Sequence, residues 1–537
     1  MKKIIFILLA AISIQQITLA QFQTPRAISE KVLNVPPFSG VMNNYGNLNS
    51  YNIPNPTGIL WGTNSYNQIV YDQGIWVIGK IQNKVHLSFN EWLSSYSPGP
   101  ILDGTAAMIS HPEDSTRYRV YKISKGDNAA NNIDYAEWPS DYGAPLKNGK
   151  PFLHGDQTLW TLYNADDDSA VSNIPDFQGQ DTLFTTPLEV QQLAYAKNIS
   201  DTTNPLHNVI FFEYKIINRG NTAIDSAYIG FWTDIDFPTS DGILTNFPAV
   251  DTTNQLGYCW DGSNGNINNH YAVGYKLLYG PITNSPGDTA IFEGKKFLDK
   301  KNMLLSSFHG IADDAVTTPL FAPAHQVSEA WNIANGFDTD GNTIDDYVSG
   351  IPTKFPFSGD PVSNSGWTYN KFPGNNVGGG AGFVMFSGPF NFAAQDSQWV
   401  MLALMPVKGT DNLDAVSKLY AKASSLDNIK YEDIITDVKE QAKTIPEKYF
   451  LSQNYPNPFN PTTIINYSIP VNGFVSLNVF NVLAQKVADL VNDKEPAGNY
   501  EISFDAQDLT SGIYFYRLSV ISKAKSFTKT KKMILLK

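Results

Sequence analysis

The stretch 209–232, VIFFEYKIINRGNTAIDSAYIGFW, shows the pattern that decides the fold class. Residues 209–217 are rich in β-branched and aromatic side chains, and from Phe212 onward every second one falls on the same face of an extended strand. Residues 218–222 supply turn chemistry, and 227–232 are predicted to return as the paired strand. Because short apolar runs broken by Gly, Pro, Asn and Asp continue to about residue 405, the sequence predicts an all-β fold.

The composition of the 537 residues agrees with this prediction. Hydrophobic residues make up 42% of the chain, which is enough for a packed core, and aromatic residues make up 13%. The formal net charge of −13 argues against a nucleic-acid partner, because a basic face is the usual footprint of such proteins. Cys259 is the single cysteine, which excludes an intramolecular disulfide and a metal site built from several cysteines.

The N-terminus is typical of an export signal. Two lysines precede an apolar run over 4–14, and Thr18 and Ala20 place small or short side chains before a cleavage point at Gln21. The run of about eleven residues is too short to cross a bilayer as a helix. We therefore expect residues 1–20 to be a cleaved signal peptide and the mature chain to contain no transmembrane segment.

Downstream of this signal the sequence divides into four parts. Residues 21–410 are predicted to be a β-rich passenger of one or two sandwiches. A helical segment is expected over 411–442, because Asp411 can cap a helix and apolar residues then recur at helical spacing. Residues 443–450 are expected to form a linker before a C-terminal module over 451–537.

The C-terminal module begins with a proline-rich entry, LSQNYPNPFNPTT, over 451–463. Proline cannot join the middle of a β-ladder, so this entry is expected to lie outside the strands. Short strand-like runs follow, and the chain ends in the lysine-rich tail FTKTKKMILLK. About seven short strands within 87 residues predict an immunoglobulin-like β-sandwich.

This module resembles the C-terminal sorting domain of type IX (Por) secretion substrates, in particular the type A kind related to the Ig-like domain of flagellar hook-capping proteins. The residues that carry the resemblance are 454–459 (NYPNPF), 496–498 (PAG), 511–512 (SG) and the lysine-rich tail. Ala484 departs from the family pattern, which usually has Gly there in a strand–turn–strand element. Alanine tolerates positive φ poorly, so the departure raises a question about the geometry of this turn.

The resemblance implies an export route and a partner in the outer membrane. The chain would cross the outer membrane through the type IX translocon and act at the cell surface or in the medium. The tail presented to the translocon would carry the sorting-signal residues Lys529, Lys531, Lys532 and Lys537. Residues 451–537 hold nine basic and six acidic residues, a net charge of +3. The alternative is that these lysines protect a solvated edge strand from pairing with other chains.

The passenger also resembles a group of uncharacterised passengers that carry the same sorting domain. The matching runs include 74–80 (GIWVIGK), 96–101 (YSPGPI), 118–123 (YRVYKI), 155–160 (GDQTLW) and 387–390 (SGPF). This resemblance implies a shared β-rich extracellular architecture and carries no known activity.

No catalytic motif stands out in the passenger. The sequence contains no Gly-x-Ser-x-Gly elbow, no His-Glu-x-x-His and no phosphate-binding loop, and its seven histidines are scattered. Asp156 and Glu189 are arbitrary candidates for the two carboxylates of a glycosidase. The leading hypothesis is a non-enzymatic surface or interaction protein. The alternative is an extracellular hydrolase directed at polysaccharide, with surface polysaccharide as a partner.

Acidic clusters are the remaining chemical signal. Asp234, Asp236, Asp241 and Asp251 follow one predicted strand closely, and such hard oxygen ligands suit Ca²⁺. The alternative is that these aspartates cap turns. A second acidic run, 338–346, resembles an EF-hand loop only superficially, because Gly341 is at loop position 4 and Ser349 replaces the required Glu. That run is better interpreted as an Asp-Gly turn.

Overall fold

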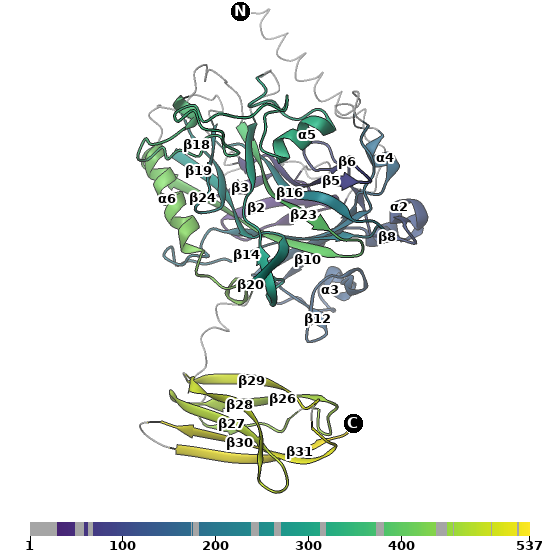
Figure 1. Ribbon diagram of the computed structural model, residues 1–537, viewed down its shortest axis with the longest axis vertical. Coiled ribbons are helices and arrows are strands. Elements are labelled where there is room, and N and C mark those ends of the chain that lie inside the picture. Colours follow the sequence, from purple (N-terminus) through teal and green to yellow (C-terminus); the bar gives the residue numbers. More distant parts are fainter. Residues whose placement is uncertain are drawn as a thin grey trace, which may run out of the picture. The chain divides into compact units, whose positions relative to one another are not determined.

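The chain forms two compact units, Met1–Ile435 and Thr436–Lys537, each of which is described by itself. The computed structural model describes residues 29–48, 58–62, 68–172, 174, 182–237, 246–262, 270–311, 318–371, 381–435, 448–454, 456–495, 497–507, 509–522 and 526–537. The predicted signal peptide over 1–20 lies outside these residues, as does 443–447 of the predicted linker. The described part is mostly antiparallel β-sheet (Figure 1), which confirms the predicted all-β fold class.

Two antiparallel sheets dominate the passenger. Over the described ranges, the larger sheet has nine strands in the order β10 (Tyr121–Ser124), β13 (Gln157–Asn164), β14 (Leu188–Ala196), β15 (Ile210–Asn218), β24 (Ser397–Gly409), β19 (His270–Tyr279), β18 (Leu256–Asp261) and β17 (Asn246–Asp251), with β7 (Ser97–Pro98) also paired to β13. The smaller has five described strands in the order β22 (Ser307–Ile311), β23 (Ala381–Phe392), β16 (Ile224–Ile235), β5 (Asp72–Ile81) and β6 (Lys84–Ser88).

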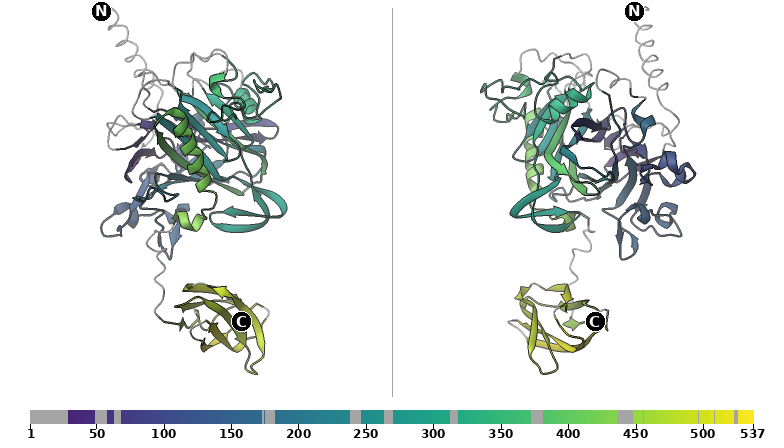
Figure 2. Two further views of the ribbon diagram at one scale, coloured as in Figure 1. Left: turned by 90° about the vertical axis from the view of Figure 1, so that its left-hand side faces the viewer. Right: turned by 45° about the vertical axis from the view of Figure 1, so that its right-hand side comes forward.

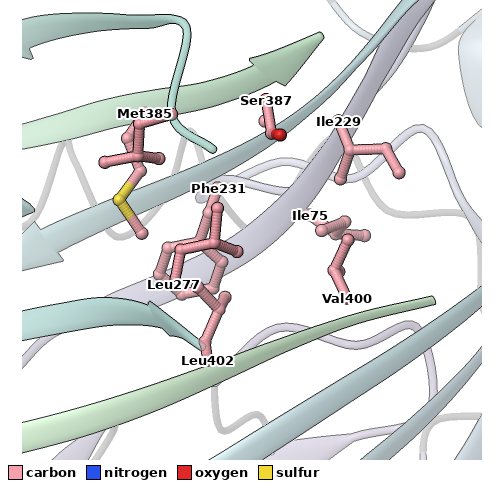
Figure 3. A pocket seen from close by; sticks show the side chains of 10 residues that line it. Ile75, Ile229, Phe231, Leu277, Met385, Ser387, Val400 and Leu402 are labelled. Carbon is pink, nitrogen blue, oxygen red and sulfur yellow. The ribbon is translucent and has the colours of Figure 1, made fainter. Parts of the chain in front are cut away.

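The main core lies between these two sheets. Alternate residues of β16, such as Ile229 and Phe231, are buried in the same cluster as Leu277 and Leu402 of the larger sheet. A cavity of about 20 Å³ lies between the two sets of side chains, which point towards one another in Figure 3. This volume holds about one water molecule, so the interior here is packed rather than hollowed for a ligand.

Helices cover the outer faces of the two sheets (Figure 2). Helix α5 (Val327–Ala334) shares a second core cluster with Trp76 and Phe386 of the five-stranded sheet. Helix α6 (Asn412–Ser425) packs on β24, β19 and β18 of the larger sheet, and α7 (Tyr431–Ile435) follows it. Asp411 caps α6, since its side chain accepts a hydrogen bond from the Asp414 N–H at 2.8 Å, as the sequence predicts. Residues 436–442 of the predicted helical segment lie outside the described residues.

Smaller elements complete the passenger. They are the sheet of β1 (Glu30–Leu33), β2 (Phe38–Asn43), β3 (Ile59–Trp61) and β4 (Gln68–Val70), the hairpins β8 (Ile101–Leu102)–β9 (Thr105–Ala106), β11 (Leu146–Lys147)–β12 (Lys150–Pro151) and β20 (Ile282–Phe292)–β21 (Lys295–Asn302), and the short helices α2 (Ala107–Ser110), α3 (Ile133–Ala136) and α4 (Asp168–Val171). Across the described ranges, no helix combines the length and the apolarity that crossing a bilayer requires.

One pairing predicted from the sequence is wrong. Strands β15 and β16 exist close to where the sequence places them, but they do not form a hairpin. β15 pairs with β14 and β24, whereas β16 pairs with β5 and β23 in the other sheet. The Asn218 side chain fixes the crossover by donating hydrogen bonds to the carbonyls of Thr222 and Ala393, at 2.9 and 3.1 Å. Both strands are largely buried on both faces, so each one needs neighbours that local turn chemistry cannot specify.

The C-terminal unit is built of two β-sheets that enclose one core. Its described residues form one sheet of β25 (Phe450–Leu451), β26 (Thr462–Ile469) and β29 (Gly498–Asp505), and another of β28 (Lys486–Glu495), β27 (Gly473–Phe480), β30 (Gly512–Ile521) and β31 (Ser526–Leu535). Alternate residues of both sheets, such as Ile465, Leu477 and Leu518, form its core. The run KVADLVNDKE of β28 lacks the clear alternation of apolar and polar residues that marks a half-buried strand in a sequence.

Candidate functional site

The proline-rich entry of the C-terminal unit packs along the last strand. β31 is an edge strand, paired on one side with β30. On its other side, the Phe459 N–H donates to the Ile534 carbonyl, and the Leu536 N–H donates to the Phe459 carbonyl, both at 2.9 Å. The Gln453 side chain also donates to the Lys532 carbonyl at 2.7 Å. Within the described residues, these hydrogen bonds reach β31 only from Lys532 onward.

The lysines predicted to carry the sorting signal surround the part of this edge that the entry leaves unpaired. Lys529 and Lys531 share one face of β31, where the Lys529 ammonium lies 5.7 Å from the centre of the Phe450 ring. Lys532 is exposed on the opposite face. Lys537 is held differently, since its side chain donates to the Gln507 carbonyl. Ammonium groups therefore lie on both faces of this edge. Such an arrangement suits docking of the edge to a partner, and it also suits protection of the edge from pairing with other strands.

The β27–β28 turn resolves the question raised by Ala484. The Asn481 side chain accepts hydrogen bonds from the N–H groups of Leu483 and Gln485, both at 3.0 Å, and the Ala484 N–H donates to the Asn481 carbonyl. Ala484 adopts φ of +60°, the left-handed conformation that favours glycine. The turn therefore keeps its shape, and the alanine is strained by about 1–2 kcal/mol.

We expect Ala484→Gly to stabilise the C-terminal unit by about 0.5–1 kcal/mol, because the relief of strain exceeds the added chain entropy of glycine. In a unit of this size, such a gain raises the melting temperature by about 4 °C. Calorimetry of the full chain can separate the two units, since all ten tryptophans precede residue 400 and their fluorescence follows the passenger alone. Ala484→Ser is the control, because serine keeps the strain; an equal rise in that variant would contradict the explanation.

Three of the four aspartates of the predicted calcium site lie in the described residues, and Asp251 is separate from Asp234 and Asp236. Asp234 lies near the end of β16, and its Oδ2 accepts a hydrogen bond from the Trp92 indole at 3.2 Å. Asp236 follows two residues later. Asp251 lies at the far end of β17, where its carboxylate accepts hydrogen bonds from the N–H groups of Thr253 and Asn254 and so caps a turn. Asp241 is outside the described residues.

The distance along β17 explains why Asp251 is separate. The Asn246 amide, at the start of β17, donates to the Ile235 carbonyl and so lies beside Asp234 and Asp236. Asp251 is five residues further along the strand, about 16 Å at the usual rise. Over the described part of the chain, no group of three or more Asp, Glu, His or Cys side chains could hold a metal ion.

The other acidic residues singled out in the sequence serve local structure. Glu189 is buried and forms an ion pair with Arg219 at 2.7 Å, and Asp156 accepts a hydrogen bond from the Asn198 N–H at 2.8 Å. In the run 338–346, the carboxylates of Asp338 and Asp346 accept hydrogen bonds from N–H groups of their own turns. None of these carboxylates is presented in the manner of a catalytic pair.

The aromatic and histidine side chains described below pack against other residues of the passenger core. Trp138 and Trp367 are buried in core clusters, and Trp92 packs edge-to-face on Trp232 with ring centres 5.2 Å apart. His154 is buried between Phe152 and Tyr195, and burial lowers its pKa to about 3. His309 is also buried. Burial lowers its pKa to about 4, against a smaller opposing effect of its hydrogen bond to the Ala322 carbonyl.

Glu213 is a buried carboxylate that the motifs and spacing in the sequence do not indicate. Its buried carboxylate accepts hydrogen bonds from the Tyr195 hydroxyl at 2.6 Å, the Trp399 indole at 3.1 Å and the Tyr431 hydroxyl at 3.1 Å. Burial raises its pKa to about 7, although these hydrogen bonds oppose the shift. The sequence feature that could have pointed to this residue is its position as the one glutamate within the largely apolar run 209–217. The contacts join three strands to α7, which indicates a structural role.

The comparisons with known proteins concern mainly the C-terminal unit. Residues 453–536 match the family described as the secretion system C-terminal sorting domain. No curated protein matches the chain.

Solved structures show only faint likeness. A polysaccharide lyase is 6% identical with a TM-score of 0.18, over 86% of this chain and 46% of that one. The dimeric latent PorU of Porphyromonas gingivalis is 8% identical with a TM-score of 0.15, over 95% of this chain and 34% of that one. The adhesin domain of Epf from Streptococcus pyogenes is 7% identical with a TM-score of 0.14, over 64% and 87%. The chain thus spans less than half the length of the first two, and at these scores none of the three bears on function.

The family match and the fold therefore agree over the same residues. The match covers all but the first few residues of the C-terminal β-sandwich, and it includes both the proline-rich entry and the lysine-bearing edge strand. Sorting domains of this kind direct export to the cell surface or the medium. The chain is a type IX secretion substrate, and residues 453–536 are its C-terminal sorting domain.

Proposed function

We propose that the sorting domain presents the unpaired edge of β31 to the outer-membrane translocon, and that the passenger it exports is a non-enzymatic surface or interaction protein. The observation that carries the first part is the edge itself. The entry pairs with β31 only from Lys532 onward among the described residues, and Lys529, Lys531 and Lys532 surround what remains. A basic edge on a chain of net charge −13 is a distinct surface for recognition.

The second part is supported by how the passenger uses its polar residues. Glu189, Asp156 and Glu213 are each engaged in ion pairs or hydrogen bonds that hold the fold. The cavity between the main sheets has room for about one water. The alternative, a hydrolase acting on polysaccharide, would need two accessible carboxylates facing a cleft. Hydrolysis of a surface polysaccharide by the purified chain would favour that alternative.

Replacement of Lys529, Lys531 and Lys532 by Gln should reduce surface and medium levels about tenfold, because three exposed charge contacts of about 0.5 kcal/mol each account for roughly that factor in binding. The matched control replaces Lys486 and Lys494 by Gln on β28, the opposite edge of the same sheet. Cell fractionation with immunoblotting measures the outcome. Normal export of the triple variant, combined with self-association in light scattering, would assign the lysines to edge protection alone.

In the same proposal, the signal peptide over 1–20 is removed before Gln21. N-terminal sequencing of the exported chain provides the readout.

A further inference from the structure

The hairpin β20–β21 carries a basic run with apolar side chains at its centre. Residues 295–301, KKFLDKK, hold four lysines and one aspartate, a net charge of +3 in a chain whose net charge is −13. All of them are exposed except Lys300, which is half-buried. Leu298 is 76% exposed and Phe297 is 39% exposed. A scattered exposed leucine is ordinary, but exposed apolar side chains with lysines on both sides form a defined surface. We call residues 295–301 the β21 patch.

Contacts with the body of the passenger hold the two ends of this hairpin and leave its middle outside. At the open end, the Ile282 N–H donates a hydrogen bond to the Gln398 side chain at 2.7 Å. At the turn end, Phe292 is buried, with its ring centre 6.2 Å from that of Trp399. The pairing of β20 with β21 is interrupted between these ends, next to Leu298. The β21 patch therefore lies at the margin of the passenger, where Figure 1 places β20.

The lysines of the patch are not neutralised by the acidic residues of the same hairpin. Glu293, in the turn, forms an ion pair with Lys215 of β15 at 3.1 Å. The Asp299 carboxylate accepts a hydrogen bond from the Gly287 N–H at 2.9 Å, across the interrupted pairing. Among the described residues, no ion pair involves a lysine of the β21 patch. Its positive charge is therefore available to a partner.

The lysines and Leu298 together restrict the chemistry of that partner. An anionic polysaccharide would contact the lysines but would offer Leu298 no apolar environment. An acidic protein surface would need an apolar pocket beside its charges. An anionic lipid surface supplies both, because its headgroup phosphates lie directly above hydrocarbon. Lysine suits this boundary, since its ammonium group can stay at headgroup level while its stem covers apolar surface.

We propose that the β21 patch docks the passenger onto an anionic lipid surface. Leu298 and the exposed part of Phe297 enter the boundary between headgroups and acyl chains, while Lys295, Lys296 and Lys301 contact lipid phosphates. A short apolar anchor binds a membrane only weakly, and several basic charges beside it make the attachment stable. Such docking is a role of the passenger itself, separate from its export by the sorting domain.

The test is sedimentation of the full chain with vesicles. Vesicles of phosphatidylglycerol and phosphatidylcholine in equal parts should bind the chain, and vesicles of phosphatidylcholine alone should not. Raising the salt to about 1 M shortens the screening length to about 3 Å and should weaken the binding. Joint replacement of Lys295, Lys296 and Lys301 by Gln should lower the partition coefficient about a hundredfold, since each lysine near an anionic surface contributes a factor of about five. Leu298→Ser should lower it about tenfold.

The matched control replaces Lys147 and Lys150 by Gln, because both are exposed on the hairpin β11–β12 beside the exposed Leu146, and it should keep full binding. Tryptophan fluorescence of each variant verifies that the passenger is folded. Three results would overturn the proposal. Absence of binding to the anionic vesicles would remove the lipid partner. Undiminished binding after replacement of the three lysines would place the membrane contact elsewhere. Full binding by Leu298→Ser would show that the patch recognises anionic charge without a bilayer, as in a polysaccharide.

Discussion

A chain that ends at residue 450 is expected to fold its passenger and remain in the periplasm, with surface and medium levels reduced to background. The sorting domain is lost, but the passenger keeps every element of its own core, since the two units have separate hydrophobic clusters. Fractionation followed by immunoblotting measures the location. Tryptophan fluorescence shows whether the passenger is folded, because all ten tryptophans remain in the truncated chain.

The control for this truncation replaces 451–537 with an unrelated β-sandwich of similar length. It should also remain in the periplasm, since bulk and fold class alone do not provide the lysine-bearing edge. Export of either chain at the natural level would show that the passenger carries its own route. A truncated chain with an unfolded fluorescence spectrum would instead show that passenger folding depends on the sorting domain.

The second large effect concerns acid stability. The folded-state pKa of His154 is about 3, because burial disfavours the imidazolium, whereas the unfolded value is about 6.5. The unfolded chain therefore binds more protons between these values. The resulting stability is present above about pH 6.5 and is lost as the pH falls towards 3. At pH 4 the loss from this one histidine is about 3 kcal/mol.

We therefore expect His154→Phe to be about 3 kcal/mol more stable than the natural chain at pH 4, relative to the difference between them at pH 7. Phenylalanine fills the same place between Phe152 and Tyr195 and cannot take up a proton. Urea unfolding of the full chain at both pH values, followed by tryptophan fluorescence, gives the two differences. His325→Phe is the control for the substitution itself, since His325 is exposed and lies outside the buried clusters.

Glu213 changes the pH dependence of stability in the opposite direction to His154. Its folded-state pKa of about 7 is above the ordinary value, so its contribution is present at low pH and is lost as the pH rises through about 7. This effect is common to the natural chain and to His154→Phe, so it cancels in their difference. An identical acid profile for the two chains would contradict the buried-imidazole explanation.

Local features of the sequence determined the fold class, the cap of α6 and the sorting domain. Strand periodicity, turn residues and the N-cap Asp411 act over a few neighbouring residues, so they can be read without the rest of the chain. The sorting domain was recognisable for a related reason. Its entry, its turn and its tail occur in a fixed order within one continuous segment.

The tertiary structure decided which strands are partners and which polar groups meet. β15 and β16 are buried on both faces, so their neighbours are set by packing against distant segments and not by the turn between them. In the same way, Glu213 meets Tyr431 from 218 positions away, and Asn246 at the start of β17 bonds the Ile235 carbonyl, whereas Asp251 lies at the other end of that strand. Burial fixes these contacts, and it depends on the whole chain closing around them.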